Sequence, residues 1–537
     1  MSYILDDCIS QSIEKIKIID ETHEKYKQLL EEIKNPKLKI KLINEIEDLE
    51  KAKLYALQYI EDFVKEKYTI DVAAPSFESS KLISKDDAEL TDLFNLCNRV
   101  SVIIDIDEEE LQKIQDDNCN EDGVRDGRKP KIYRRANSVV FKINDCEWII
   151  ENVGIRQRGN TSRNDIFIDG KLNNENHFKL SFEETFTDVS IYGEEYVAKY
   201  GNESYNDRTF LKMDSIDLKY NKCKDLTHVK EIYASRIYRA AGCIYQHIGL
   251  CSMRMNDTDF GLCNIFESSG NNMLKLAMQS EENYINMATW KEEKKGTHGI
   301  PNVNYGDYYK IQYGVGESYR SDTGGDMSEY SVSENRVGVK EDPYGRYVPA
   351  YERKTNKKVT YDDKQLKDMV KTQSLPDENY FAIEEAVSFC IGNPDSWMYN
   401  YNNCKIYFRR TDGKMIIIPI DNDRAFGIGE TWVDGLKFVY DVSLTPHSDR
   451  TISSEPNHNY VFMNTLLNEY NITSLIFDIA INTIVKSGWL ENDNFLKLFE
   501  IAKDTYNDFD FTLSNGDNIS FQEFINVKIE ACKDILF

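Results

Sequence analysis

The chain has 537 residues, which is enough for two to four domains and a sizeable hydrophobic core. Its 66 basic and 92 acidic residues give a net charge of −26, which opposes binding to nucleic acid or an anionic membrane and favours a basic protein partner. The opening MSYILDDCIS resembles no secretory signal and no apolar run could span a bilayer, so we expect cytosolic synthesis and no membrane partner. The eleven cysteines contain no C-x-x-C pair, which argues against a disulfide framework and a zinc ribbon.

Two amphipathic helices are predicted at the start of the chain. Apolar residues recur at steps of three and four within 6–34 and again within 42–63, and Asn35-Pro36 separates the two stripes. We therefore expect a coiled-coil-like helical hairpin over 1–70, an accessory segment whose apolar stripes pack together, on the main domain or on another copy, where they would support self-association. Residues 71–98 are expected to form a linker.

The segment from 99 to 182 is expected to contain mainly strands, because apolar residues alternate in SVIIDID, KIYRRANSVVFKIN, CEWIIENVGIRQRG and FKLSF. The acid-rich stretch DDNCNEDGVRDGRKP resembles a calcium-binding loop. Its twelfth position is Lys129, however, where such a loop needs a bidentate glutamate. A surface loop is the better interpretation.

A short basic turn, RGNTSRN, separates the last two of these strands. Gly159 and the small polar side chains of Asn160 and Ser162 would let backbone amides approach phosphate oxygens, and Arg158 and Arg163 add positive charge. A basic surface turn without a ligand explains the same residues equally well. Both interpretations stay open at this point.

The middle of the chain predicts a helix, a hairpin and a long excursion. HVKEIYASRIYRAAG at 228–242 is typical of a helix, and Glu231 is its only acid. QHIGLCSMRMN and DTDFGLCNIFE predict a hairpin that ends at Glu267. Within 268–375 a polar, Gly-rich stretch is expected to lie on the surface, and helices are expected to dominate the last eighty residues.

The stretch from Gly392 to Gly429 carries the clearest chemical pattern. Asp395 precedes Asn400 by five residues, CKIYFRR and MIIIPI predict a hairpin, and Asp421 and Asp423 follow its second strand. Phosphoryl transfer from a nucleotide needs an acid that accepts the hydroxyl proton and oxygen ligands for magnesium, and protein kinases present them in this order. Asp and Asn are also ordinary turn and capping residues, so a structural interpretation stays open beside the catalytic one.

The same stretch resembles the core of the spore-coat protein H (CotH) kinase family, an atypical branch of the protein-kinase-like proteins. The family reads roughly G-N-x-D-x4-N, a hairpin, I-P-x-D-x-[DE] and an aromatic-Gly pair, which correspond here to GNPD with Asn400, to IPIDND, and to Phe426-Gly427. Upstream, RQRGNTSRN, FKLSF, GLCNIFESSG, YYKIQYG and ERKTNKK follow the family order, so that the resemblance covers about residues 99–510. The chain departs from the family before Glu267, where Leu262 and Cys263 follow the glycine in place of an aromatic residue.

The resemblance implies an α+β, two-lobed protein-kinase-like domain behind the helical hairpin. A β-rich N-lobe would cover 99–267, and a helical C-lobe with the catalytic and metal-binding loops would cover 268–537. The implied activity is transfer of the ATP γ-phosphate, with Mg²⁺ or Mn²⁺, to Ser or Thr of a protein substrate and of the protein itself. The implied substrates are spore-coat proteins, which would place the protein at the spore coat.

The resemblance also assigns roles to single residues. Asp395 would orient and deprotonate the acceptor hydroxyl, and Asn400, Asp421 and Asp423 would hold the metal. Lys179, within FKLSF, would engage the phosphates in the catalytic site, and Glu231 is its natural partner, although a surface glutamate would fit the same pattern. The remaining residues expected to contact the cofactor are Arg158, Gly159, Asn160, Ser162, Arg163 and Glu267.

Two alternatives to phosphorylation stay open on the sequence. A pocket of this kind can transfer other groups, such as a nucleotidyl group in an AMPylation-like reaction if ATP is bound in the reverse direction. The chain could also be a structural coat or assembly protein with a vestigial pocket. The presence of Asp395, Asn400, Asp421 and Lys179 argues against complete loss of the site.

Overall fold

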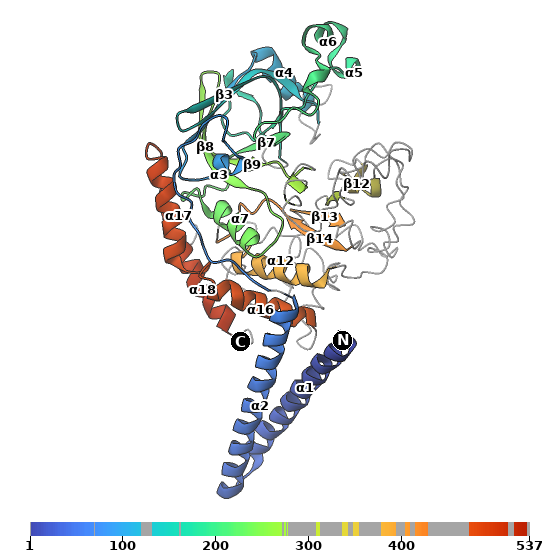
Figure 1. Ribbon diagram of the computed structural model, residues 1–537, viewed down its shortest axis with the longest axis vertical. Helices are drawn as coiled ribbons and strands as arrows, with labels where there is room; N and C mark the ends of the chain where they lie inside the picture. Colours follow the sequence, from blue (N-terminus) through green and yellow to red (C-terminus); the bar gives the residue numbers. More distant parts are fainter. Residues whose placement is uncertain are drawn as a thin grey trace.

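The computed structural model describes residues 2–68, 70–119, 131–159, 163–270, 273–274, 277, 308–311, 336–341, 347–353, 377–393, 403–408, 414–427, 472–513 and 520–533. Figure 1 shows a β-barrel at one end of the molecule, helices beneath it and a long helical hairpin at the other end. The acid-rich loop around Lys129 and most of the polar excursion within 268–375 lie outside the described residues.

A closed barrel of seven strands forms the part of the molecule between residues 100 and 267, in the order β1-β2-β3-β6-β7-β9-β8. Alternate side chains of these strands fill its interior, among them Phe141, Phe178 and Ile265. The strands are β1 (Val100–Asp105), β2 (Arg134–Ile143), β3 (Cys146–Gln157), β6 (Phe178–Ser181), β7 (Ser215–Tyr220), β8 (Ile248–Met255) and β9 (Thr258–Glu267).

The expectation of a two-lobed protein-kinase-like fold is wrong, because that fold does not accommodate the closed seven-stranded barrel. Strand β1 pairs antiparallel with β2 on one side and parallel with β8 on the other, so the sheet has no open edge. Closure joins residues such as Ser101 and Ser252, which are far apart in the chain. Hydrophobic periodicity predicts strands but not their partners, and for this reason the sequence did not reveal the barrel.

A second sheet lies beside the barrel and contains the hairpin predicted from CKIYFRR and MIIIPI. Strands β13 (Cys404–Phe408) and β14 (Met415–Pro419) pair antiparallel, which confirms that hairpin, and the residues of both are buried. The sheet has the order β11-β12-β10-β13-β14, with β10 (Tyr308–Ile311), β11 (Arg336–Glu341) and β12 (Tyr347–Arg353). A separate ribbon pairs β4 (Phe167–Ile168) with β5 (Lys171–Leu172).

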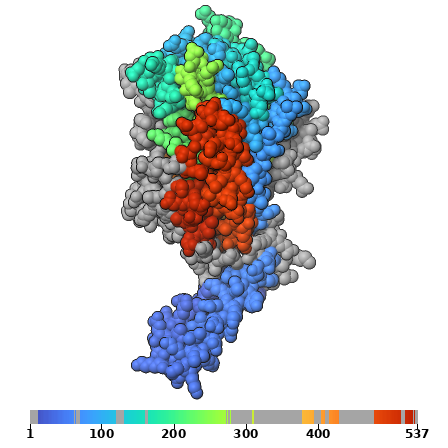
Figure 2. All heavy atoms as spheres, turned by 90° about the vertical axis from the view of Figure 1, so that its left-hand side faces the viewer, coloured from blue at the N-terminus to red at the C-terminus, as the bar shows by residue number. Residues whose placement is uncertain are grey.

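Helices pack beneath the barrel and along one side of both sheets (Figures 1 and 2). Helix α12 begins where the Asp377 side chain accepts a hydrogen bond from Tyr380 N and ends at Gly392, which has a left-handed φ of 60°. The larger helices here are α7 (Lys230–Ala240), α12 (Glu378–Ile391), α16 (Ile472–Lys486), α17 (Asn492–Thr505) and α18 (Phe521–Lys533). Of the shorter helices, α4 (Glu108–Asp117), α5 (Val189–Tyr192) and α6 (Glu194–Tyr200) lie at the opposite end of the barrel (Figure 1), and the others are α3 (Leu90–Phe94) and the 3₁₀ turn η1 (Glu203–Tyr205).

The N-terminal helices α1 (Ser2–Glu32) and α2 (Pro36–Tyr68) lie side by side and project from the body (Figure 1). Ile16, Leu57 and Ile60 join the same buried cluster as the helices of the body, so the base of the hairpin is packed against them. The segment after α2 is also attached, because Ala73 O accepts a hydrogen bond of 2.7 Å from the Trp489 indole. Among the described residues, none of the helices has both the length and the apolar character that crossing a bilayer requires.

Tyr506, directly after α17, links strands β8 and β1 where they pair to close the barrel. Its hydroxyl donates to Leu250 O on β8 at 2.6 Å and accepts from Val100 N at the start of β1 at 3.0 Å. The side chain is completely buried, so water cannot replace these hydrogen bonds.

We predict that Tyr506→Phe lowers the stability of the barrel. The substitution keeps the ring and removes both hydrogen bonds, which leaves buried backbone groups without partners at a cost of about 1 to 3 kcal/mol. The measurement is the urea midpoint, with Tyr55→Phe as the control because Tyr55 is 79 % exposed. Equal midpoints for the two variants would contradict this role.

Candidate functional site

The candidate site is built around Lys219 on the outer face of β7. Ile216 and Leu218 of this strand point into the barrel, so Asp217 and Lys219 point outward, toward α7 and the loop that follows β14. The Lys219 Nζ lies 3.3 Å and 3.4 Å from the two Glu231 carboxylate oxygens, 3.4 Å from Asp423 Oδ2, and within hydrogen-bonding distance of Asp421 Oδ1. One ammonium group is thus shared by three carboxylates, and we call these four residues the lysine cluster.

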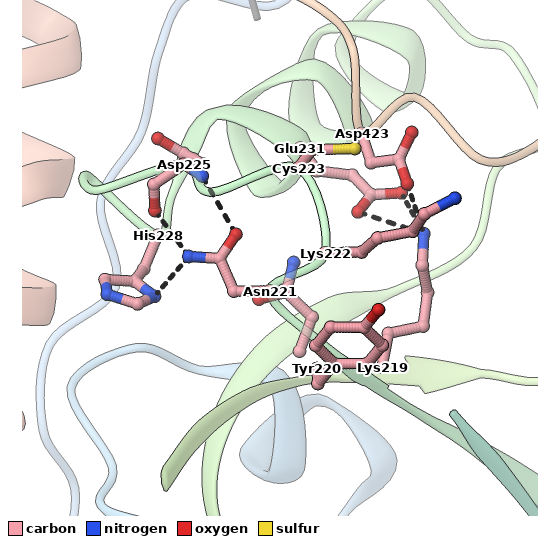
Figure 3. Close-up of a pocket in the computed structure, with 10 residues that line it drawn as sticks. Lys219, Tyr220, Asn221, Lys222, Cys223, Asp225, His228, Glu231 and Asp423 are labelled. Atoms are coloured by element: carbon pink, nitrogen blue, oxygen red, sulfur yellow. Dashed lines mark hydrogen bonds and ion pairs between the residues drawn. The ribbon is translucent and has the colours of Figure 1, made fainter. Parts of the chain in front are cut away.

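A rigid loop places Glu231 opposite Lys219. Asp225 caps the start of α7, where its Oδ2 accepts from Lys230 N at 3.0 Å. Asn221 holds the loop from the other side, since its amide donates to Asp225 O at 2.8 Å and its Oδ1 accepts from Asp225 N at 2.9 Å. Glu231 therefore faces β7 from the first turn of the helix, and Figure 3 shows it with Lys219 and Asp423 beside a pocket that the β7–α7 loop lines.

The other two carboxylates follow β14 on a loop with an unusual backbone. Asp421 has a φ of 63° and Phe426 a φ of 57°, in the left-handed region that non-glycine residues rarely adopt. Hydrogen bonds hold this conformation, because Phe426 N donates to Ile391 O at 2.8 Å and Lys230 Nζ donates to Phe426 O at 2.9 Å. Helices α7 and α12 thus fix the loop in this conformation.

The lysine cluster carries more negative than positive charge. Burial alone would lower the pKa of Lys219, but Asp421, Asp423 and Glu231 outweigh it and raise that pKa well above its usual value. Burial, together with the two aspartates, raises the pKa of Glu231 to about 8, against the lowering effect of Lys219. Burial would also raise the pKa of Asp421, yet Lys219 and Arg158 lower it below the usual range. The cluster is net negative whether or not Glu231 is protonated, so it suits a cation.

Asp421 and Asp423 fit the requirements of Mg²⁺ bound together with phosphate. Their side chains are 37 % and 22 % exposed, against 6 % for Lys219, so they lie on the accessible side of the cluster. Magnesium usually takes one or two carboxylates, keeps several waters and completes its shell with substrate phosphates. In the part of the chain that the structure describes, no group of three or more His, Cys, Asp or Glu residues is arranged to hold a metal by itself.

Lys179 and Arg158 lie beside the cluster, in contact with Asp217. Arg158 Nη1 is 3.0 Å from Asp217 Oδ2, and Lys179 Nζ is 3.9 Å from Asp217 Oδ1 and hydrogen-bonded to Ser268 Oγ. The lysine that pairs with Glu231 in the structure is Lys219, and Lys179 lies near Asp217 instead. The two lysines stand on the neighbouring strands β6 and β7.

The remaining predicted residues divide into three groups. Arg163 holds the basic turn, because its Nε donates to Gly159 O at 2.9 Å and its Nη1 to Asn118 Oδ1 at 2.6 Å. Glu267 is buried, and its carboxylate lies 2.7 Å from His247 Nδ1, which stabilises the β8–β9 hairpin. The residues outside the described part of the chain are Asn160, Ser162, Asp395 and Asn400.

Lys219 is the functional candidate that sequence reasoning missed, although the sequence carried a signal for it. SIDLKY at 215–220 alternates like a strand and directly precedes the helix that carries Glu231. The lysine of a strand that immediately precedes this helix is better placed to meet its first turn than one on an earlier strand. FKLSF matched the family motif, which led us to choose Lys179, and Lys219 was not considered.

A scan against protein-family models finds no match to this chain, and a search of curated proteins finds none either. We therefore infer a function from the geometry of the lysine cluster and from the motifs in the sequence.

We predict that Lys219→Met strongly destabilises the fold, because it leaves Glu231, Asp421 and Asp423 facing one another without a cation. Removing one partner of a buried ion pair typically costs about 3 to 5 kcal/mol. Adding Asp421→Asn should restore part of this loss, since it removes one of the two aspartate charges that have lost their counter-ion. The measurement is again the urea midpoint.

The control is Lys142→Met, which removes an ammonium group from an exposed ion pair with Glu147. It should change the midpoint little, since exposed pairs contribute about 0 to 1 kcal/mol. If Lys219→Met were as stable as this control, the lysine cluster would not hold the two sheets together.

Proposed function

We propose that the protein is an ATP- and Mg²⁺-dependent protein kinase that phosphorylates Ser or Thr of protein substrates. The observation that carries the proposal is the lysine cluster, in which a strand lysine, a helix glutamate and an aspartate after a buried strand meet. Protein kinases use a lysine–glutamate ion pair to position the nucleotide phosphates and an aspartate to bind Mg²⁺. The proposal concerns this set of side chains and does not depend on a kinase-like fold.

Each side chain has a defined task in the proposed reaction. Lys219 contacts phosphate oxygens from the floor of the site, and Glu231 and the rigid β7–α7 loop hold its ammonium group in place. Asp421 and Asp423 would hold Mg²⁺, which when bound neutralises charge on the phosphates. Asp395 is the proposed base that accepts the hydroxyl proton, and Asn400 the proposed further metal ligand.

The motif resemblance guides the choice of acceptor. It is the reason to test spore-coat proteins first, and the net charge of −26 makes basic proteins the next candidates. Autophosphorylation is testable without any knowledge of the substrate. Mass spectrometry after incubation with MgATP distinguishes the proposed reaction, which adds a phosphoryl group, from nucleotidyl transfer, which adds AMP.

We predict that Asp421→Asn reduces Mg²⁺-dependent ATP affinity roughly 100-fold. This is the upper end of the loss in affinity that is typical when a residue at a metal site is mutated. The neutral amide keeps the shape of the side chain but no longer supplies a charged oxygen ligand. Isothermal titration calorimetry with ATP in Mg²⁺ and in EDTA gives the metal-dependent part of the affinity. The control is Asp145→Asn, which lies in the exposed turn between β2 and β3. A folded Asp421→Asn protein with unchanged Mg²⁺-dependent affinity would place the metal elsewhere.

A further inference from the structure

The residue between the two candidate metal ligands, Asn422, is oriented differently from both of them. Asp421 and Asp423 contact Lys219 Nζ, and their side chains are 37 % and 22 % exposed. Asn422 is only 1 % exposed, and its side chain contacts other elements. The two carboxylates therefore lie on the accessible side of the loop, and the amide between them lies in the interior.

Two hydrogen bonds anchor the side-chain amide of Asn422. Its Oδ1 accepts a hydrogen bond from Asn393 Nδ2, and its Nδ2 donates to the Tyr245 hydroxyl at 2.6 Å. Asn393 follows the end of α12, and Tyr245 lies in the segment between α7 and β8. One buried side chain thus joins the loop after β14 to the chain segments that follow two helices. We call Asn393, Asn422 and Tyr245 the amide network.

The two partners of Asn422 are themselves fixed in place. Asn393 is 1 % exposed and Tyr245 is 4 % exposed. The ring of Tyr245 stacks on the ring of Tyr238, with centroids 4.9 Å apart and an interplanar angle of 1°. Water cannot easily replace hydrogen bonds between groups that are buried to this extent, so the amide network holds the loop firmly.

The amide network has a direct consequence for the two carboxylates. Asp421 has a left-handed φ of 63°, which a residue other than glycine keeps only where its surroundings hold it. Asn422 is the next residue, so its anchored side chain fixes the backbone on which both neighbouring aspartates stand. Residues behind the ligands of a metal ion orient those ligands, and their mutation typically lowers metal affinity by about 10- to 100-fold.

We propose that Asn422 is a positioning residue for a divalent cation, and that its hydrogen bonds to Asn393 and Tyr245 hold Asp421 and Asp423 in the arrangement that binds the metal. The inference rests on the proposed function for the place of the metal. Asn422 and Tyr245 act through the backbone of the loop and do not touch the cation themselves. Loss of either hydrogen bond releases the loop and separates the two carboxylates from their binding positions.

The test is Mn²⁺ binding to the full chain without nucleotide, measured by electron paramagnetic resonance, since Mn²⁺ takes the same oxygen ligands as Mg²⁺. Tyr245→Phe keeps the ring and removes the acceptor of the Asn422 amide, so it should weaken Mn²⁺ binding by about 10-fold. Asn422→Ala removes both hydrogen bonds and should weaken binding at least as much. Circular dichroism verifies that each variant is folded.

The matched control is Tyr506→Phe, which also removes a buried tyrosine hydroxyl, but at the closure of the barrel. It should bind Mn²⁺ as tightly as the intact protein. The inference is overturned if Tyr245→Phe and Asn422→Ala retain the full affinity for Mn²⁺. It is also overturned if Tyr506→Phe weakens binding as much as they do, because a general loss of stability would then explain the effect.

Asp421→Asn distinguishes this inference from the proposed function. If Asp421→Asn weakens Mn²⁺ binding but Asn422→Ala and Tyr245→Phe do not, the positioning role alone fails. If all three variants weaken Mn²⁺ binding and the intact protein transfers no phosphoryl group from MgATP, the proposed function alone fails. An intact protein that binds no Mn²⁺ would contradict both.

Discussion

The ammonium group of Lys219 connects three parts of the structure that are distant in sequence. The barrel supplies the lysine, α7 supplies Glu231, and the loop after the second sheet supplies Asp421 and Asp423. The Lys219 side chain is only 6 % exposed, so its charge requires partners within the protein. The barrel, helix α7 and the second sheet must therefore be assembled together for the buried charge of Lys219 to be stabilised.

This constraint accounts for the rigidity around the cluster. Asp225 and Asn221 fix the entry to α7, and Lys230 on that helix holds the loop in which Asp421 and Phe426 have left-handed backbone. Such a loop cannot relax toward a more common conformation without separating the carboxylates from Lys219. The geometry is thus prepared before any ligand binds, which reduces the free-energy cost of ordering the site on binding.

The charges around Lys219 decide what the site can bind. Three carboxylates, those of Glu231, Asp421 and Asp423, surround its one ammonium group. In the proposed function, this negative charge attracts Mg²⁺ together with the phosphates that it carries.

Local pattern in the sequence predicted the pieces of this site better than their assembly. Alternating and continuous apolar runs identified the β13–β14 hairpin, and the acids that follow it led directly to Asp421 and Asp423. The helix with Glu231 was also predicted, because the helical pattern of 228–242 and the glycine that ends it, Gly242, are local signals. Closure of the barrel could not be predicted from the sequence, since the pairing of β1 with β8 joins distant segments and has no local sequence signal. For the same reason Lys219 was missed, since its contact with Asp421 spans 202 positions in the chain.

The anomalous X-ray signal of Mn²⁺, in crystals grown with Mn²⁺ and a non-hydrolysable ATP analogue, tests the proposed metal site most directly. Mn²⁺ can replace Mg²⁺ at oxygen ligands and is located without reference to a model of the ligand. If Asp421 and Asp423 hold the metal, we expect an Mn²⁺ peak at their carboxylates and phosphate density that contacts Lys219 Nζ. An Mn²⁺ peak and a nucleotide at another place on the molecule, with the lysine cluster unchanged, would contradict this assignment.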